Sequence, residues 1–341
     1  LFVLPSLFIL IFLSWIYIAF GDMPIVAGIF YGIKPAVTAI VLQATFRIGS
    51  RALKHPVLWL IATASFIAIF TLNVPFPLIV LVAACVGAIG GRFAPEKFKV
   101  SSSHGKSNTT HGAAIIDDGT PTPPHAQFHW SRLRIIAMIG GLLWAIPMGV
   151  LTLMYGWHGT LTQMGWFFSK AALLTFGSAY AVLPYVYQGA VEYYHWLTPT
   201  QMIDGLALGE TTPGPLIMVV TFAGFVGGYM QAIFGSAALF LSGAVAAIVV
   251  TGFCFLPSFL FILAGGPLVE STHGDIKFTA PLTAITAAVV GVILNLAVFF
   301  AYHVMWPQGF TGTFDGVSAL IALGAAIALL KYKRNVIHVI G

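Results

Sequence analysis

The sequence contains very little charge. Only 7% of its 341 residues are Asp, Glu, Lys or Arg, whereas soluble domains contain about 25%. Hydrophobic residues make up 59% of the chain, and the mean hydropathy is +0.95. This composition excludes an ordinary soluble domain. It predicts an all-α polytopic membrane protein, because the apolar runs are too long for the strands of a membrane barrel.

Cysteine and catalytic motifs are scarce as well. The two cysteines, Cys85 and Cys254, lie within apolar runs, so we expect packing residues and no disulfide. The sequence has no His-Glu-x-x-His, no Gly-x-Ser-x-Gly and no paired Asp motif in an apolar run, and we therefore expect no enzyme and no cofactor. The net charge of +5 does not indicate nucleic-acid binding, because the basic residues sit mostly in loops, where they set membrane topology.

The apolar runs that are present divide into about ten candidate crossings of a lipid bilayer. Four precede the one long polar segment, at residues 1–20, 25–46, 55–72 and a short run that ends at 91. Six follow it, at residues 135–155, 165–188, 201–230, 237–264, 279–306 and 314–330.

The polar segment, residues 92–134, is basic and rich in Ser, Thr, Pro and Gly. This composition predicts a solvated cytoplasmic linker between two halves. Four histidines lie in it: His104, His111, His125 and His129. Metal sensing is one interpretation, but their spacing is irregular and no cysteine is near, so we expect no metal site.

Short motifs recur in the two halves. The repeated pairs are Leu4-Pro5-Ser6 with Leu256-Pro257-Ser258, Pro35–Ile40 with Pro281–Ile285, and the apolar runs that begin at Val57 and Val317. The first three spans therefore match the last three, although chance similarity of apolar sequences is the alternative.

Basic residues indicate that the two copies run in opposite directions. Arg47, Arg51 and Lys54 precede the third span, whereas Lys331, Lys333 and Arg334 follow its counterpart. Because basic loops face the cytoplasm, we predict two inverted-topology repeats, as in many secondary transporters. The organisation is then 1–91 for the remainder of the first repeat, 92–134 for the linker, and 135–341 for a connecting helix and the second repeat. The comparison of the copies also predicts a sequence truncated at both ends.

One apolar segment, residues 197–228, carries features that a lipid-facing helix would not keep. It contains Asp204, Glu210 and the run Thr211-Thr212-Pro213-Gly214-Pro215. Pro213 and Pro215 lack an N–H, and Gly214 is conformationally loose. We predict that the helix breaks near Thr211–Pro215 and restarts with Pro215 in its first turn. The alternatives are a substrate site and a kink that only shapes packing.

The same region resembles a known family. Phe168–Ala172, Phe176–Pro184, Leu197-Thr198 and above all Gln201–Pro215 are similar to the C-terminal half of a long-form chromate ion transporter. The resemblance implies a multi-pass protein of the bacterial inner membrane that exports chromate and confers chromate resistance, with sulfate as the chemical analogue. Transport of sulfate or another oxyanion and an anion channel are the alternative functions. Membrane lipid is an expected partner, and the sequence is compatible with a homo-oligomer.

Chromate is a tetrahedral dianion, which needs N–H or hydroxyl donors and few positive charges. Lys170 is a candidate ligand, with snorkelling to the interface as its alternative role. Ser178 stands where the family often shows glycine. The candidate substrate-binding residues are Lys170, Ser178, Tyr180, Thr211, Thr212 and Gly214.

Two acidic residues are candidates for coupling. Glu210 would repel a dianion if ionised, so we expect either a coupling role or a cap on the restarted helix. For Asp204 an interfacial or capping role is favoured over coupling, because the residue lies near the start of its helix. Asn295 is expected to pack between helices.

Overall fold

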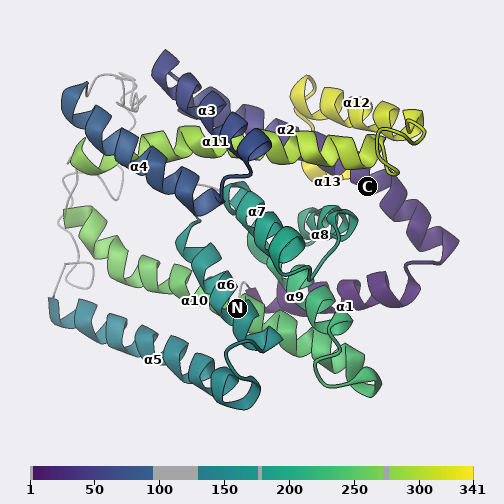
Figure 1. Ribbon diagram of the computed structural model, residues 1–341, viewed down its shortest axis with the longest axis horizontal. Coiled ribbons are helices and arrows are strands. Elements are labelled where there is room, and N and C mark those ends of the chain that lie inside the picture. Colours follow the sequence, from purple (N-terminus) through teal and green to yellow (C-terminus); the bar gives the residue numbers. More distant parts are fainter. Residues whose placement is uncertain (1–2, 95–129, 176–178, 272–275, 341) are drawn as a thin grey trace, which may run out of the picture.

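The computed structural model describes residues 3–94, 130–175, 179–271 and 276–340, and within them it is helical, with no strand (Figure 1). The predicted all-α polytopic class is confirmed. Among the described residues, six helices are long and apolar enough to cross a membrane, and three shorter apolar helices accompany them.

Eight of the described helices, α3 and α12 of the shorter set among them, follow predicted spans. They are α1 (Val3–Phe20), α2 (Pro24–Ala52), α3 (Pro56–Leu72), α4 (Phe76–Phe93), α5 (Trp130–Tyr155), α10 (Leu239–Ser271), α11 (Ile276–Met305) and α12 (Gly316–Leu330), followed by the short α13 (Val336–Ile340). Proline opens α2 and α3, where its missing N–H costs nothing. The predicted end of the second span at residue 46 was wrong. Helix α2 continues to Ala52, so Arg47 and Arg51 lie on its last turns and not in a loop.

Between α5 and α10 the chain forms shorter pieces. These are α6 (Thr160–Leu173), α7 (Ala179–Tyr187), the π-helix η2 (Gln188–Tyr193), α8 (Pro199–Thr211), the 3₁₀-helix η3 (Leu216–Met218), α9 (Val219–Met230) and the 3₁₀-helix η4 (Ser236–Ala238). The predicted single span 165–188 is therefore wrong, because α6 ends at Leu173 and α7 begins at Ala179. The 14 residues of α6 span about 21 Å, less than the roughly 30 Å of a hydrocarbon core.

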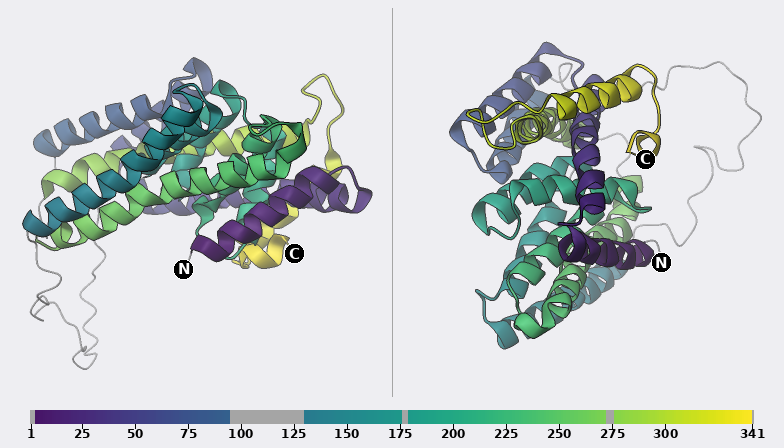
Figure 2. Two further views of the ribbon diagram at one scale, coloured as in Figure 1. Left: turned by 90° about the horizontal axis from the view of Figure 1, so that it is seen from below. Right: turned by 90° about the vertical axis from the view of Figure 1, so that its right-hand side faces the viewer.

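Helix α11 lies at the centre and α5 at the periphery. In the apolar window of α11, 67% of residues are buried inside the protein, against 11% in that of α5. Helices α2, α3 and α4 pack around α11, whereas α5 packs against α6 and α10 along one edge (Figure 2). The exposed apolar surface of α5 is what a lipid-facing helix requires.

The contacts between helices recur in the two halves of the chain, as the sequence motifs do. α2 packs against α12, and their repeat counterparts α11 and α3 pack against each other in the same way. The Tyr31 hydroxyl donates to Asp315 at 2.8 Å, and the Gln43 amide donates to the Leu329 carbonyl at 3.3 Å, so α2 and α12 run parallel. The basic clusters that follow these two helices therefore lie toward the same end, as two inverted repeats require.

Asp315 holds the start of α12. Its carboxylate accepts from the Ser318 N–H at 3.0 Å, the Val317 N–H at 3.1 Å and the Ser318 hydroxyl at 2.8 Å. These donors, the Ser318 backbone first, hold the pKa of this exposed carboxyl below its usual value. The cap and the bond from Tyr31 tie the N-terminal part of α2 to the start of α12.

Candidate functional site

Helix α8 begins and ends on local signals in the sequence. At its start, Thr198 and Gln201 form a reciprocal capping box around Pro199. At its end, the hydroxyls of Thr211 and Thr212 donate to the Leu208 carbonyl at 3.0 and 2.7 Å. The predicted break is confirmed, with the small correction that Pro215 directly precedes η3 and does not lie in its first turn. Both hydroxyls already donate to a backbone carbonyl of α8, so an anion would compete with the Leu208 carbonyl oxygen for these two hydrogen bonds.

Helix α1 closes one side of this break. The Ser6 hydroxyl donates to the Pro213 carbonyl at 2.5 Å. Gly214 has a φ of +150°, and a Cβ built on it would lie 2.1 Å from the Ser6 oxygen. Only glycine fits this conformation and this close approach. The loop is thus held in place by a residue of the repeated Leu-Pro-Ser motif.

Glu210 is held from two other helices. The Tyr180 hydroxyl of α7 donates to its carboxylate, and Arg47 of α2 acts on it electrostatically. No side chain of a described residue, Glu210 included, caps η3, so the expectation that Glu210 caps the restarted helix is wrong. Tyr180 itself is buried, and the pair joins α7 to the last turn of α8.

Asp204 lies deeper, in the middle of α8, and is only 1% exposed. It accepts a hydrogen bond from Tyr17 of α1 at 2.8 Å, and Lys34 of α2 lies 3.3 Å from the same oxygen, Oδ2. Oδ1 is buried with no hydrogen-bond partner among the described residues. The favoured capping role was therefore wrong, because the cap is Thr198 and Asp204 is a buried ion-pair residue. The interfacial role stays a prediction.

Lys170 lies away from the break. Its ammonium sits 5.5 Å from the centroid of the Trp166 ring, and it lines a pocket of about 500 Å³ together with Asn73, Gln188 and Glu192. A second pocket, of about 390 Å³, shares the last three residues and reaches Asn295.

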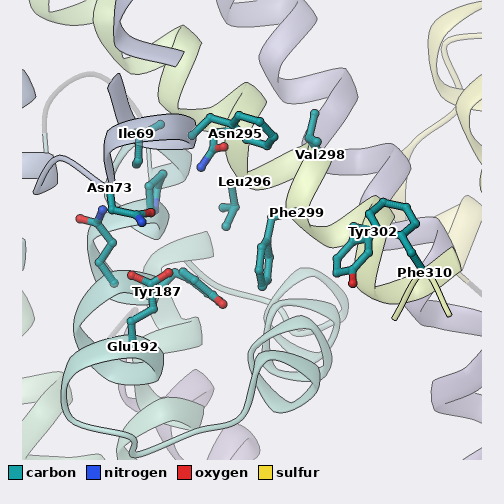
Figure 3. Close-up of a pocket in the computed structure, with 13 residues that line it drawn as sticks. Ile69, Asn73, Tyr187, Glu192, Asn295, Leu296, Val298, Phe299, Tyr302 and Phe310 are labelled. Atoms are coloured by element: carbon teal, nitrogen blue, oxygen red, sulfur yellow. The ribbon is translucent and has the colours of Figure 1, made fainter. Parts of the chain in front are cut away.

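Figure 3 shows Glu192 and Tyr187 on one wall of the second pocket, with Asn295 and Leu296 on the facing wall. Gln188 joins η2 to the start of α4, since its side chain accepts from the Phe76 N–H at 2.9 Å and donates to the Val74 carbonyl at 3.3 Å. Asn295 thus faces a pocket, where interhelical packing was expected. π-Helices are frequent at functional sites, but no sequence pattern marked this one.

The comparisons with known proteins agree with this architecture. A family model described as chromate transporter matches residues 1–88 and 162–341. The chain belongs to the chromate transporter family. The matched segments include α1, α2, α7 and α8, so all the groups around the break lie within the region that defines the family.

Curated relatives cover nearly the whole chain. It is 26% identical to a chromate transport protein of Cupriavidus metallidurans, over 98% of this chain and 69% of that protein. It is 29% identical to a chromate transport protein of Pseudomonas aeruginosa, over 99% of this chain and 71% of that protein. An uncharacterised transporter of Methanocaldococcus jannaschii is 24% identical to it, over 99% of this chain and 72% of that protein. No solved structure matches the chain.

The structure brings some of the predicted site residues together and separates others. Thr211, Thr212, Gly214 and Tyr180 surround the break, while Lys170 lies in the pocket of Glu192. Ser178 and the four linker histidines lie outside the described residues. Within the described residues, no group of three or more His, Cys, Asp or Glu could hold a metal ion.

Sequence analysis missed the residues that other helices bring to α8. These are Ser6, Tyr17, Lys34 and Arg47. One signal was available: Lys34 is a lysine within an apolar span, beside the repeated Pro35, and an intramembrane cation indicates a functional site.

Proposed function

We propose that this protein is a secondary active transporter that exports chromate across the bacterial inner membrane. Membership of the family supports the substrate. The observation that carries the mechanism is the break between α8 and η3, because α1 sends Ser6 to the break itself, α7 sends Tyr180 to the last turn of α8, and α2 sends Lys34 to the middle of α8. Irregular backbone at membrane depth is stable only inside protein or beside a cavity. Broken helices with this property form the substrate sites of many transporters.

The break offers an oxyanion two kinds of donor. The first is the backbone from Gly214 into η3, where restarting helical geometry leaves N–H groups without intrahelical acceptors. The second is the pair of hydroxyls on Thr211 and Thr212, which would exchange the Leu208 carbonyl for the stronger bond to a dianion. Tyr180 completes the proposed site among the described residues, and Ser178 is assigned to it from the sequence alone. Lys170, in the pocket of Glu192, would attract the anion on its way.

Two inverted repeats supply the proposed motion. The predicted units are residues 1–91 and 135–341. Helix α8 contacts α1 and α2 of the first unit through Tyr17 and Lys34, and the Ser6 hydroxyl of α1 bonds to Pro213 in the break. The two units interlock, since α11 packs among α2, α3 and α4. Movement of α8 and α9 relative to α1 and α2 would open the break to each side in turn, as alternating access requires.

Flux measurements test this proposal. The protein is reconstituted into proteoliposomes, and uptake of radiolabelled chromate is followed with sulfate as competitor and with unlabelled chromate inside the vesicles. A carrier predicts saturable uptake that internal chromate accelerates. Uptake that does not saturate and ignores internal chromate would indicate a pore, and absence of any chromate flux would contradict the proposed substrate.

A further inference from the structure

The ion pair between Lys34 and Asp204 is not among the residues assigned to the substrate site above. The Lys34 ammonium is 3.3 Å from Asp204 Oδ2, with side-chain exposures of 26% and 2%. The lysine therefore remains accessible, while the carboxylate is enclosed. Lys34 stands within α2, in a segment apolar enough to span the membrane, where an unpaired charge is strongly disfavoured.

Asp204 is bound asymmetrically. Both of its partners, Tyr17 and Lys34, meet Oδ2, and Oδ1 is buried without a hydrogen-bond partner among the described residues. Among the described residues, Lys34 and Tyr17 are the titratable groups that act on this carboxylate. A purely structural ion pair would be expected to satisfy both oxygens, because an unsatisfied buried acceptor is costly. The arrangement neutralises Lys34 without giving Asp204 its full set of bonds.

The pair also spans the moving parts of the proposed carrier. Lys34 belongs to the first repeat, and Asp204 lies on α8, the helix that ends at the break. One carboxylate oxygen on an ammonium has the same chemistry as one oxygen of a tetrahedral oxyanion on that ammonium.

We infer that Asp204 is an internal substitute for the transported oxyanion: it neutralises Lys34 when no substrate is bound, and the oxyanion displaces it. This inference rests on the proposed transport function and adds Lys34 as a substrate ligand. Displacement leaves Lys34 paired with the dianion, and the freed, buried carboxylate of Asp204 takes up a proton, so that no unpaired anion remains beside the substrate. When the substrate leaves, Asp204 releases that proton and the ion pair re-forms, with no net charge on the two side chains. Both forms can reorient, because neither carries an isolated buried cation.

Net uptake and exchange of chromate should respond differently to loss of the Asp204 charge. Asp204→Asn leaves Lys34 without a counter-ion whenever substrate is absent, so the unloaded carrier should fail to reorient. Net chromate uptake into proteoliposomes should fall about tenfold or more. Exchange of external radiolabelled chromate for internal chromate should persist, because the oxyanion accompanies Lys34 in both directions.

Two further variants keep the test decisive if Asp204→Asn does not accumulate. Lys34→Gln removes the ligand, and the half-saturation concentration for chromate exchange should rise about tenfold or more. Lys34→Gln combined with Asp204→Asn removes both charges and should recover net uptake relative to Asp204→Asn, at the same weakened affinity. Asp22→Asn is the matched control, since Asp22 is exposed in the turn between α1 and α2, and it should behave as wild type.

The outcomes distinguish this inference from the proposed function. If the wild-type protein carries out neither net uptake nor exchange, both ideas fall. If the wild type does both and Asp204→Asn keeps its net uptake, or Lys34→Gln keeps its affinity, the ion pair is structural and only the inference is overturned.

Discussion

The Ser6 hydroxyl donates a hydrogen bond to the Pro213 carbonyl, although the two residues are 207 positions apart. The contact joins the first helix of the chain to the break that separates α8 from α9. It explains why Gly214 is glycine, since a Cβ there would lie 2.1 Å from the Ser6 oxygen. A bulky residue at Gly214 would therefore disturb α1 as well as any bound anion.

The first prediction concerns this contact. Gly214→Ala should lower the free energy of unfolding by about 1–3 kcal/mol, because its backbone conformation favours glycine and the new methyl meets Ser6. Adding Ser6→Gly should restore the share of the lost free energy of unfolding that the collision with the Ser6 side chain causes. The share that the strained backbone of residue 214 causes should remain. Thermal unfolding in detergent measures both. Gly252→Ala is the control, because a Cβ at Gly252 meets no atom within 4 Å, and equal effects of the two alanines would contradict the account.

Lys170 gives the second prediction. If the Lys170 ammonium binds the oxyanion directly in its pocket on the way to the break, Lys170→Gln should raise the half-saturation concentration for chromate about tenfold or more, because hydrogen bonds to charged groups contribute about 1.5–3 kcal/mol. Lys170→Arg should retain most of the affinity. Lys54→Gln, at an exposed position after α2, controls for loss of a positive charge. Unchanged uptake by Lys170→Gln at low chromate would leave the lysine only its contact with Trp166.

Membrane topology is the third prediction. Single cysteines are introduced into a protein that lacks Cys85 and Cys254, and intact cells are treated with an impermeant thiol reagent. Positions in 156–162 and 308–313 should react, and positions in 92–134 should not, because the basic segments face the cytoplasm. The parallel packing of α2 and α12 leads to the same expectation. Labelling of the polar segment from outside would contradict the inverted arrangement.

The sequence predicted those parts of the fold that local chemistry determines. The long apolar helices and the break at Thr211–Pro215 follow from hydropathy and from two prolines that cannot donate. The break between α6 and α7 was missed because no proline stands there: Pro184 lies inside α7.

The partners of the acidic residues could not be predicted in the same way. Tyr17 and Asp204 are 187 positions apart, and only the packing of α1 and α2 against α8 brings them together. Asp204 was assigned to a helix end because it lies near the start of the predicted span 201–230, whereas its burial depends on neighbouring helices that the local sequence does not identify.

The central claim is that the break between α8 and α9 binds the oxyanion. Its most direct test is the half-saturation concentration for chromate uptake by Thr211→Val combined with Thr212→Val, in proteoliposomes with sulfate as competitor. Thr200→Val, at an exposed position near the start of α8, is the matched control, and thermal unfolding shows whether loss of the bonds to Leu208 disturbs the protein. The account predicts that the double valine variant stays folded and that its half-saturation concentration rises about tenfold or more. A folded double variant with the wild-type half-saturation concentration would contradict it, and the break would then serve only to shape the packing of α1 against α8 and α9.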